Sequence, residues 1–302
     1  MIRKYRKIRN TVKVLAVCFI VCCSCISCEK SVRSITLDQT AVTLKVGDTL
    51  LLHATIEPEK AENKTVVWTS SDPTVAMVLN GMVIAMDEGT ATISATSAEG
   101  EKTANCIVTV ENSGPRAMVV MIAFADHDME IVLAGTGAVK INWGDETEEN
   151  FTLSTTPTSY KHDCASTFGQ VITITGNNVT YMECISFDIK FVDVSKNTKL
   201  TELYCGGSFM DNIDLSKNTK LKKFTCYSDL SGLDVSKNTA LIELDVKYCN
   251  FLADKLNALF ETLHDKPIQG GKTIYIGVYG NSEECDKSIA EQKGWTVIMD
   301  PF

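Results

Sequence analysis

Cysteine is the residue type whose spacing in this chain most clearly suggests chemistry. Cys184, Cys205 and Cys226 recur at intervals of 21 residues, and thiolates are common zinc ligands. Each follows an apolar residue by two positions, however, and a metal centre needs a pocket and polar groups around its ligands. We therefore predict no metal here, and expect an internal row of thiols instead. Disulfides along the row stay open, although the strand geometry would have to bend to form them.

A second candidate for chemistry is the acidic run Asp145, Glu146, Glu148 and Glu149. Carboxylate oxygens are the ligands that Ca²⁺ prefers. The sequence lacks the Asp-x-Asp-x-Asp-Gly spacing of a calcium loop, so a solvated hairpin tip is the favoured interpretation and a Ca²⁺ site the alternative. The four histidines, at 53, 127, 162 and 264, do not pair with one another at metal-ligand spacing.

Catalytic signatures are missing from the sequence. It contains no Gly-x-Ser-x-Gly, His-Glu-x-x-His, Cys-x-x-Cys or phosphate-binding glycine loop. A hydrolase would also need a nucleophile with its base, or a cleft with paired carboxylates. We predict that the protein is not an enzyme and needs no cofactor.

The N-terminus predicts export. Six basic residues precede Leu15, an apolar run extends from Val14 to Cys23, and small residues follow. The run is shorter than the roughly 20 residues of a spanning helix. Cys25-Ile-Ser-Cys28 resembles a bacterial lipobox, which implies a signal peptide at 1–27, lipidation of Cys28 and a tether at 28–32. Acyl chains would then bind the protein to a membrane.

Charge and cysteine number limit the partners further. Removal of residues 1–27 leaves 23 basic against 38 acidic side chains, a balance of −15. A nucleic-acid backbone is bound through Lys and Arg, so we predict no nucleic-acid partner. Seven cysteines remain after Cys28, an odd number, so at least one is unpaired. A disulfide between Cys249 and Cys285 stays open.

The elements that must position these residues follow from an internal repeat. Asp-Val/Leu-Ser-Lys-Asn-Thr occurs at 193–198, 214–219 and 234–239, and four units begin at Val179, Leu200, Leu221 and Leu241. Apolar residues alternate within each unit, which predicts stacked strands that cover one another's apolar rows. Residues 179–250 resemble internalin-type leucine-rich repeats, in which a stacked cysteine replaces a leucine. Asn197, Asn218 and Asn238 are expected to hydrogen-bond exposed backbone in the bends.

The residues between the buried positions of the repeats would point outward and form a face rich in tyrosine and charge. Solenoids bind through such a sheet face, and tyrosine is enriched in interfaces. An ordinary solvated face is the alternative. The candidate ligand-binding residues are Tyr181, Tyr204, Lys223, Tyr227, Glu243, Asp245 and Lys247.

Residues 33–111 show apolar alternation interrupted by turn signals every 8–12 residues, the pattern of an all-β sandwich. Trp68, Val75-Ala76-x-Val78, Gly81-x-Val83 and Cys106-x-Val108-x-Val110 closely resemble the bacterial Ig-like domain of the second group. That resemblance implies a spacer or adhesion module at the cell surface. We expect Trp68 and Cys106 to lie in its core.

Two further segments complete the chain. After a linker at 112–117, residues 118–178 are expected to form a small β domain, since Trp143-Gly-Asp145 followed by Tyr160-x-His162 resembles the polycystic-kidney-type sandwich. Residues 251–302 are expected to form an α/β cap over the open end of the repeats. Its helices are predicted at 251–264 and 285–293, and its strands at 273–278 and 295–299.

The sequence thus predicts a multidomain protein: an all-β Ig-like sandwich, a small β domain, and a short leucine-rich-repeat solenoid with an α/β cap. The resemblances imply a non-enzymatic, lipid-anchored envelope protein on the outer membrane that binds a host protein or glycan. One alternative is a periplasmic structural or assembly factor. A more remote one is an accessory subunit of a glycan-degrading system.

Overall fold

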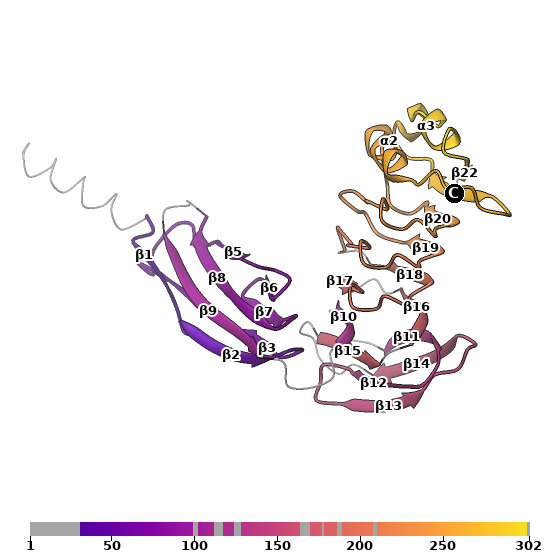
Figure 1. The fold of residues 1–302 in the computed structure, drawn as a ribbon. Helices are drawn as coiled ribbons and strands as arrows, with labels where there is room; N and C mark the ends of the chain where they lie inside the picture. Colours follow the sequence, from indigo (N-terminus) through magenta and orange to yellow (C-terminus); the bar gives the residue numbers. More distant parts are fainter. Residues whose placement is uncertain are drawn as a thin grey trace, which may run out of the picture. The chain divides into compact units, whose positions relative to one another are not determined.

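The computed structural model describes residues 31–98, 102–111, 117–123, 128–163, 170–176, 178–185, 189–207 and 210–300. The chain divides into two compact units, Met1–Ser113 and Gly114–Phe302. Figure 1 shows their elements. The expected signal peptide with Cys28, most of the expected linker at 112–117, and Cys164 lie outside the described residues. Within the described ranges, no helix has the length and apolar character needed to cross a membrane.

In the described residues of the first unit, nine strands form three sheets. One sheet pairs β1 with β4, a second has the order β2-β9-β8-β5, and a third has the order β3-β7-β6. The strands are β1 (Ser34–Leu37), β2 (Ala41–Lys45), β3 (Thr49–Leu51), β4 (Ala54–Glu57), β5 (Val66–Ser70), β6 (Ala76–Leu79), β7 (Met82–Ala85), β8 (Gly89–Ser97) and β9 (Thr103–Glu111).

Period-two alternation explains the packing of this unit. Ala91, Ile93 and Ala95 of β8 are fully buried, whereas the residues between them are not. Cys106 on β9 is also fully buried, as expected, and Trp68 is half-buried against two apolar clusters. The β6–β7 hairpin turns through Asn80 and Gly81, both with positive φ, which is the two-residue turn that suits the strand twist.

The second unit begins with a pair of β-sheets. Its five-stranded sheet has the order β13-β12-β15-β10-β17, while β11, β14 and β16 belong to an eight-stranded sheet. The elements are β10 (Ala117–Ala123), β11 (Asp128–Gly135), β12 (Ala138–Asn142), β13 (Glu148–Thr152), β14 (Thr158–Asp163), β15 (Gln170–Gly176), β16 (Val179–Ile185) and β17 (Ile189–Asp193).

The eight-stranded sheet continues as a parallel stack that follows the sequence repeat. From β16 onward, neighbours in the sheet pair in parallel, in chain order through β22. Figure 1 shows these strands one above another in the orange to yellow part of the chain. They are β18 (Glu202–Gly206), β19 (Lys223–Cys226), β20 (Glu243–Val246), β21 (Lys272–Gly277) and β22 (Trp295–Asp300).

Cysteines occupy one internal row of this stack. Cys184 pairs in register with Cys205, and Cys205 with Cys226, and all three are fully buried. Cys249 is also buried, and its thiol donates to the Cys226 carbonyl over 3.5 Å. All six described cysteines have free thiols, Cys249 and Cys285 included.

The asparagines of the repeated turn form a second internal row. As expected, Asn218 and Asn238 hydrogen-bond backbone in the bends, but all three asparagines are buried, whereas we expected them to bond exposed backbone. Asn218 Nδ2 donates to the carbonyls of Val194 and Asn197, each over 2.9 Å. Asn238 Nδ2 repeats the pattern one unit later, to Leu215 and Asn218. The second and the third turn are therefore each tied to the turn before by a side chain.

No fold boundary lies at residue 178, where we expected a small β domain to end and the repeats to begin. The first repeat strand, β16, pairs antiparallel with β11 on one side and parallel with β18 on the other. One continuous apolar core runs from Val119 to Trp295. Residues 118–178 and the repeats are therefore parts of one unit, because the first repeat covers its apolar row with β11.

The C-terminal residues differ in detail from the predicted elements. Helix α2 (Ala253–Thr262) lies within the expected range. The second expected helix is present but shorter, as α3 (Ser288–Glu291), and the 3₁₀ turn η1 (Ser282–Glu284) precedes it. The buried Lys272 ammonium donates to the carbonyls of His264, Lys266 and Lys293 over 3.1, 3.0 and 2.6 Å. Burial lowers the pKa of Lys272.

Candidate functional site

The outward side chains of the parallel stack form what we call the tyrosine face. Residues one strand position apart alternate between core and surface, so Met182, Cys184 and their equivalents point inward while their neighbours point outward. The face consists of Tyr181, Glu183, Glu202, Tyr204, Lys223, Tyr227, Glu243, Asp245, Lys247, Tyr248 and Tyr275, while Thr225, on the same side of its strand, is buried. The face includes five of the eight tyrosines of the chain.

Two tyrosines and two glutamates form a square at the start of the face. Tyr181 pairs in register with Glu202, and Glu183 with Tyr204, so the residue types alternate along and across β16 and β18. The Tyr181 hydroxyl donates to Glu183 Oε2 over 2.8 Å, and the Tyr204 hydroxyl donates to Glu202 Oε2 over 3.2 Å. The two rings lie with centroids 5.3 Å apart.

Burial and the adjacent carboxylates keep these phenols neutral. Partial burial, followed by the hydrogen bond to Glu183, raises the pKa of Tyr181 well above its ordinary value. Partial burial and the charge of Glu202 raise the pKa of Tyr204 to about 12. Both hydroxyls are therefore donors at neutral pH.

The later strands of the face carry charge pairs and a second tyrosine pair. Lys223 Nζ lies 3.6 Å from Glu243 Oε2. Lys247 Nζ lies 3.7 Å from Asp245 and 3.1 Å from Asp300, and 5.7 Å from the centre of the Tyr248 ring. The half-exposed rings of Tyr227 and Tyr248 stack with centroids 4.9 Å apart.

A glycine makes room for the second tyrosine pair. A Cβ at Gly206 would lie 2.6 Å from Tyr227 Cβ and 2.7 Å from its backbone nitrogen and oxygen. Contacts this short with backbone atoms are not relieved by side-chain rotation. Gly206 therefore fixes how closely the chain after β19 approaches β18, and with it the position of Tyr227.

The structure brings the seven candidate ligand-binding residues onto one face, but in separate contacts: Tyr181 with Tyr204, Lys223 with Glu243, and Asp245 with Lys247. Tyr227 joins Tyr248, which sequence reasoning missed, as it missed Tyr275 and Asp300. The alternation of apolar residues within Lys272–Gly277 was the available signal for Tyr275, because it places this side chain on the outward side of the strand. In the structure Tyr275 pairs in register with Asp245.

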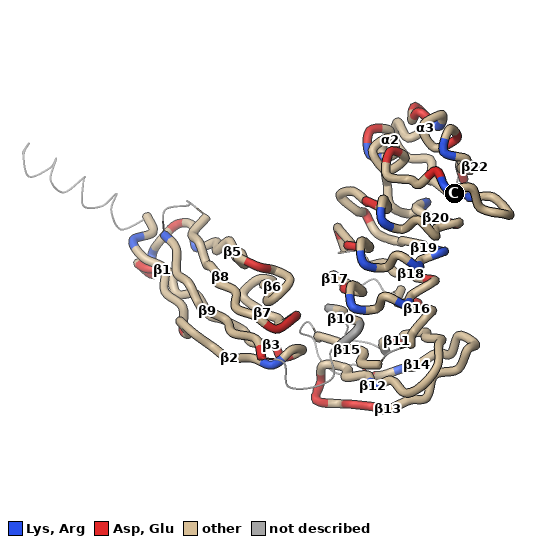
Figure 2. The backbone as a smooth tube through the Cα atoms, in the orientation of Figure 1, with Lys and Arg blue, Asp and Glu red and all other residues tan. Residues whose placement is uncertain are grey.

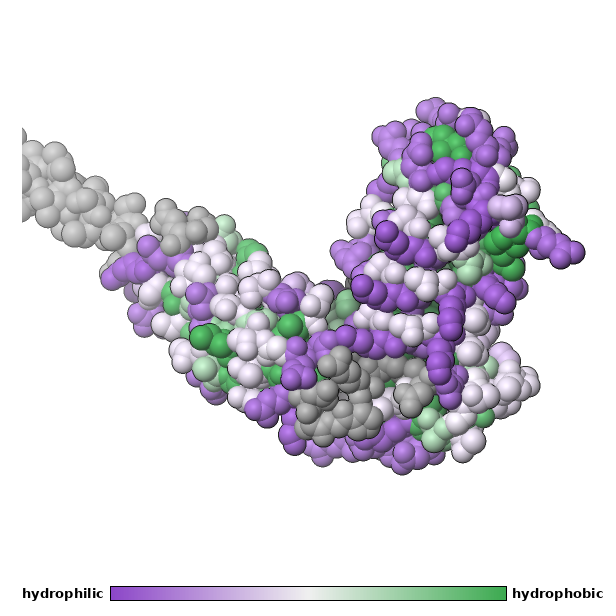
Figure 3. Space-filling view, viewed as in Figure 1, coloured by the Kyte–Doolittle hydropathy of each residue, from purple (hydrophilic) through white to green (hydrophobic). Residues whose placement is uncertain are grey.

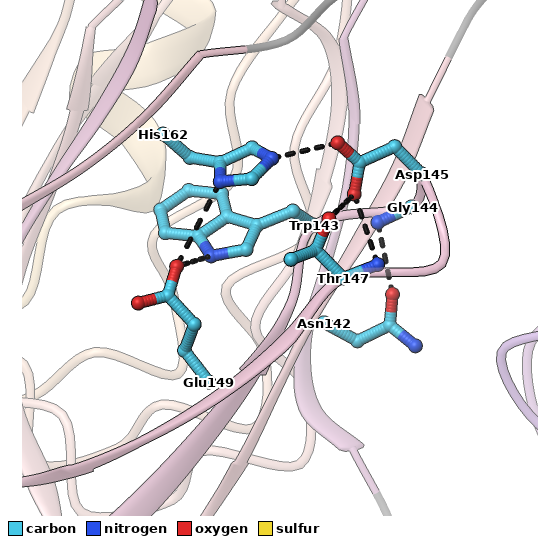
Figure 4. A network of polar contacts seen from close by, with 7 residues as sticks. All are labelled: Asn142, Trp143, Gly144, Asp145, Thr147, Glu149 and His162. Atoms are coloured by element: carbon cyan, nitrogen blue, oxygen red, sulfur yellow. Dashed lines mark hydrogen bonds and ion pairs between the residues drawn. The ribbon is translucent and has the colours of Figure 1, made fainter.

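The acidic run at 145–149 belongs to a different arrangement, shown in Figure 4. Trp143 is fully buried, and its indole N–H donates to Glu149 Oε1 over 2.9 Å. The His162 ring stacks on Trp143 and donates from Nε2 to Asp145 Oδ2 over 2.7 Å. The other Asp145 oxygen accepts bonds from the backbone N–H and the hydroxyl of Thr147.

This network fixes a turn and leaves few oxygens for a cation. Burial opposes ionisation of Asp145, but hydrogen bonds from His162 and Thr147 outweigh it and lower the pKa of the carboxyl. Within the described ranges, no group of three or more His, Cys, Asp or Glu side chains is arranged to hold a metal ion. Burial also raises the pKa of the Cys184 thiol, which opposes the thiolate form that binds a metal.

Charged and hydrophilic groups occupy much of the surface of the stack that the figures show. Figure 2 shows Lys and Arg at the edge of the stack and Asp and Glu concentrated on the β13 hairpin. In the view of Figure 3 hydrophilic side chains cover most of the stacked strands. The tyrosine face itself consists mainly of aromatic and charged side chains, so binding there would use aromatic rings, hydrogen bonds and charge.

Comparison with known proteins accounts for the first unit. The family described as bacterial Ig-like domain (group 2) matches residues 31–108. Residues 31–108 are a bacterial Ig-like domain of the second group. The expected boundaries of 33–111 differ from this match by only a few residues at each end. The tyrosine face lies outside the matched segment.

The Ig-like domain occurs in proteins of very different kinds. An Ig-like virion protein of Serratia phage KSP90 is 42% identical over 82 residues, covering 26% of this chain and 32% of that protein. A 3-O-alpha-D-galactosyl-alpha-L-arabinofuranosidase of Bifidobacterium longum subsp. longum is 48% identical over 69 residues, covering 22% of this chain and 6% of the enzyme. The chain thus spans a third or less of the length of these relatives.

Proposed function

We propose that this protein is a non-enzymatic binding protein of the bacterial cell envelope, and that the tyrosine face is its recognition surface. The observation that carries this proposal is the concentration of five tyrosines and several charged groups on one sheet face. Tyrosine provides contact area together with a hydrogen-bonding hydroxyl, which suits either a protein or a glycan ligand.

We infer further that residues 179–250 are leucine-rich repeats of the internalin type and that residues 251–302 form their α/β cap. Two observations support this: the repeat of 20–21 residues, and the parallel register that aligns Cys184, Cys205 and Cys226. In this architecture the Ig-like domain is a stalk between the membrane anchor and the binding unit.

The proposed anchor is a lipid on Cys28 after removal of residues 1–27, with the protein held at the outer membrane and exposed to the exterior. The lipobox-like segment supports the anchor, and the Ig-like domain is consistent with a surface location. Protease treatment of intact cells tests exposure. Cleavage is expected, whereas full protection would favour the periplasmic structural or assembly factor.

A second candidate function has one observation in its favour. Two arabinofuranosidases of Bifidobacterium longum carry a segment similar to the Ig-like domain, at 48% and 45% identity. The same domain could therefore serve an accessory subunit of a glycan-degrading system. The tyrosine face would then bind the glycan that the system degrades. Glycans are therefore included in the binding experiment described next.

The test is an array of proteins and glycans probed with the 29–302 protein. The double variant Tyr204→Ala/Tyr227→Ala is expected to weaken binding to the ligand found, because it removes one ring from each tyrosine pair. Val67→Ala/Ile107→Ala provides the control, since both side chains are about half exposed on the Ig-like domain. Loss of binding in the control variant alone would move the site to that domain.

A further inference from the structure

The square of Tyr181, Glu183, Glu202 and Tyr204 differs from the later strands of the tyrosine face because its carboxylates form no ion pair among the described residues. Lys223 pairs with Glu243, and Lys247 with Asp245 and Asp300. Within the described part of the chain, neither Glu183 nor Glu202 forms an ion pair with a Lys or Arg side chain. The square therefore holds two carboxylates without an ion-pair partner in the described structure, and Lys223, in register with Glu202 on the next strand, is paired with Glu243 instead.

The two carboxylates retain unused hydrogen-bonding capacity. Each accepts one bond from a tyrosine hydroxyl, whereas an ionised carboxylate can accept about four. Both glutamates are half-buried, so their positions are held by the strand and by the phenol beside them. A donor group arriving from outside would meet preformed acceptors and would not have to break an ion pair of Glu183 or Glu202.

The rings of Tyr181 and Tyr204 add a second attraction for a cation. Their centroids lie 5.3 Å apart with the planes tilted by 37°. A cation within about 6 Å of a ring centroid is attracted by the negative face of the π system. The alternation of phenol and carboxylate along and across the strands places both kinds of attraction around one point.

We propose that this square binds an arginine side chain presented by an extended basic segment of a partner protein. The guanidinium group is planar, offers five N–H donors in a fixed fork, stacks on aromatic rings and pairs with carboxylates. The proposal rests on the proposed function of the tyrosine face and names its ligand class. A balance of −15 after residue 28 adds long-range attraction for a basic partner.

The probe is an acetylated and amidated Ser-Arg-Ser-Arg-Ser peptide, titrated into the 29–302 protein by calorimetry at low ionic strength. The same peptide with citrulline in place of arginine keeps the shape and loses the charge. The arginine peptide is expected to bind at least about tenfold more tightly than the citrulline peptide, and rising salt should weaken its binding. Equal binding of the two peptides, or no binding of the arginine peptide, would overturn the proposal.

The double variant Glu183→Gln/Glu202→Gln locates the site. It is expected to reduce affinity for the arginine peptide by at least about tenfold. Removal of two negative charges that have no ion-pair partner in the described residues should leave the temperature of unfolding unchanged or raised, so loss of binding cannot be ascribed to unfolding. The control Glu148→Gln/Glu261→Gln removes two exposed carboxylates elsewhere, and its affinity should stay within about twofold of the parent. An unchanged affinity in the first variant would refute the assignment.

The outcome also separates this proposal from the broader one. A glycan that binds the parent and the Glu183→Gln/Glu202→Gln variant equally, but not the Tyr204→Ala/Tyr227→Ala variant, would replace the basic partner by a sugar. The tyrosine face would then still be the recognition surface. If neither double variant changes the affinity for any ligand that binds the parent, both the arginine site and the tyrosine face as recognition surface are refuted.

Discussion

The buried asparagine amides of the repeated turns contribute to the stability of the parallel stack. Asn218 donates two hydrogen bonds to the preceding turn, whereas the equally buried Asn197 amide has no hydrogen-bond partner in the described structure. The two residues have the same side chain and the same position in the repeat. They therefore offer a matched comparison of packing with and without hydrogen bonding.

We expect Asn218→Ala to lower the free energy of unfolding by about 1–3 kcal/mol more than Asn197→Ala, because it removes two donors from buried carbonyls. Urea denaturation of both variants measures the difference. Equal losses in the two variants would mean that the amide row contributes by packing alone.

The carboxyl of Asp145 gives the fold a dependence on pH. Its folded pKa lies below its ordinary value, so its contribution to stability is present above about pH 4 and disappears as pH falls through the folded pKa. Asp145→Asn should therefore destabilise the protein at pH 7, and the difference from the parent should shrink near pH 3. The exposed Asp163→Asn is the control. A difference that is constant across this range would exclude the proposed linkage.

The close approach between β18 and the segment after β19 depends on the glycine at position 206. We expect Gly206→Ala to destabilise the protein by about 1–3 kcal/mol, because the added methyl group would meet the backbone of Tyr227. Gly232→Ala is the matched control, since nothing lies within 4 Å of its Cβ position. Thermal unfolding compares the two variants. A stable Gly206→Ala protein would show that β18 and the segment after β19 can move apart.

Repeated and alternating patterns made part of the fold predictable. The Ser-Lys-Asn-Thr phrase and the spaced cysteines placed successive strands in register, and Tyr204 and Lys223 on a common face, because a strand's two sides differ by one position. The role of Lys272 was not predictable. Its three carbonyl partners, His264, Lys266 and Lys293, come from segments whose proximity no local pattern encodes.

The hydrogen-bond network around Trp143 was likewise not predictable from the sequence. The acidic run suggested a solvated hairpin tip, yet Asp145 and Glu149 bind His162 and Trp143 across the turn. The likeness of Trp-Gly-Asp to a known sandwich marked the turn, but it did not reveal that the following strands share a sheet with the repeats. Pairing between distant strands depends on tertiary packing, which a local window does not contain.

The domain organisation of the chain depends on which strands cover the apolar side chains of their neighbours. Residues 114–302 have one continuous core, and β16 depends on β11. We expect a fragment of residues 114–302 to unfold cooperatively, and a fragment of residues 179–302 to lack a cooperative transition, because its first strand loses its cover. Circular dichroism during heating tests both. A cooperative 179–302 fragment would restore a domain boundary at residue 178.

The tyrosine face as recognition surface can be tested directly by nuclear magnetic resonance of the 29–302 protein with isotope-labelled tyrosine, titrated with its array-identified ligand. The expected result is that resonances of Tyr181, Tyr204, Tyr227, Tyr248 or Tyr275 shift, while the buried Tyr160 stays unchanged. If the ligand binds and none of these five resonances moves, the recognition surface lies elsewhere on the protein.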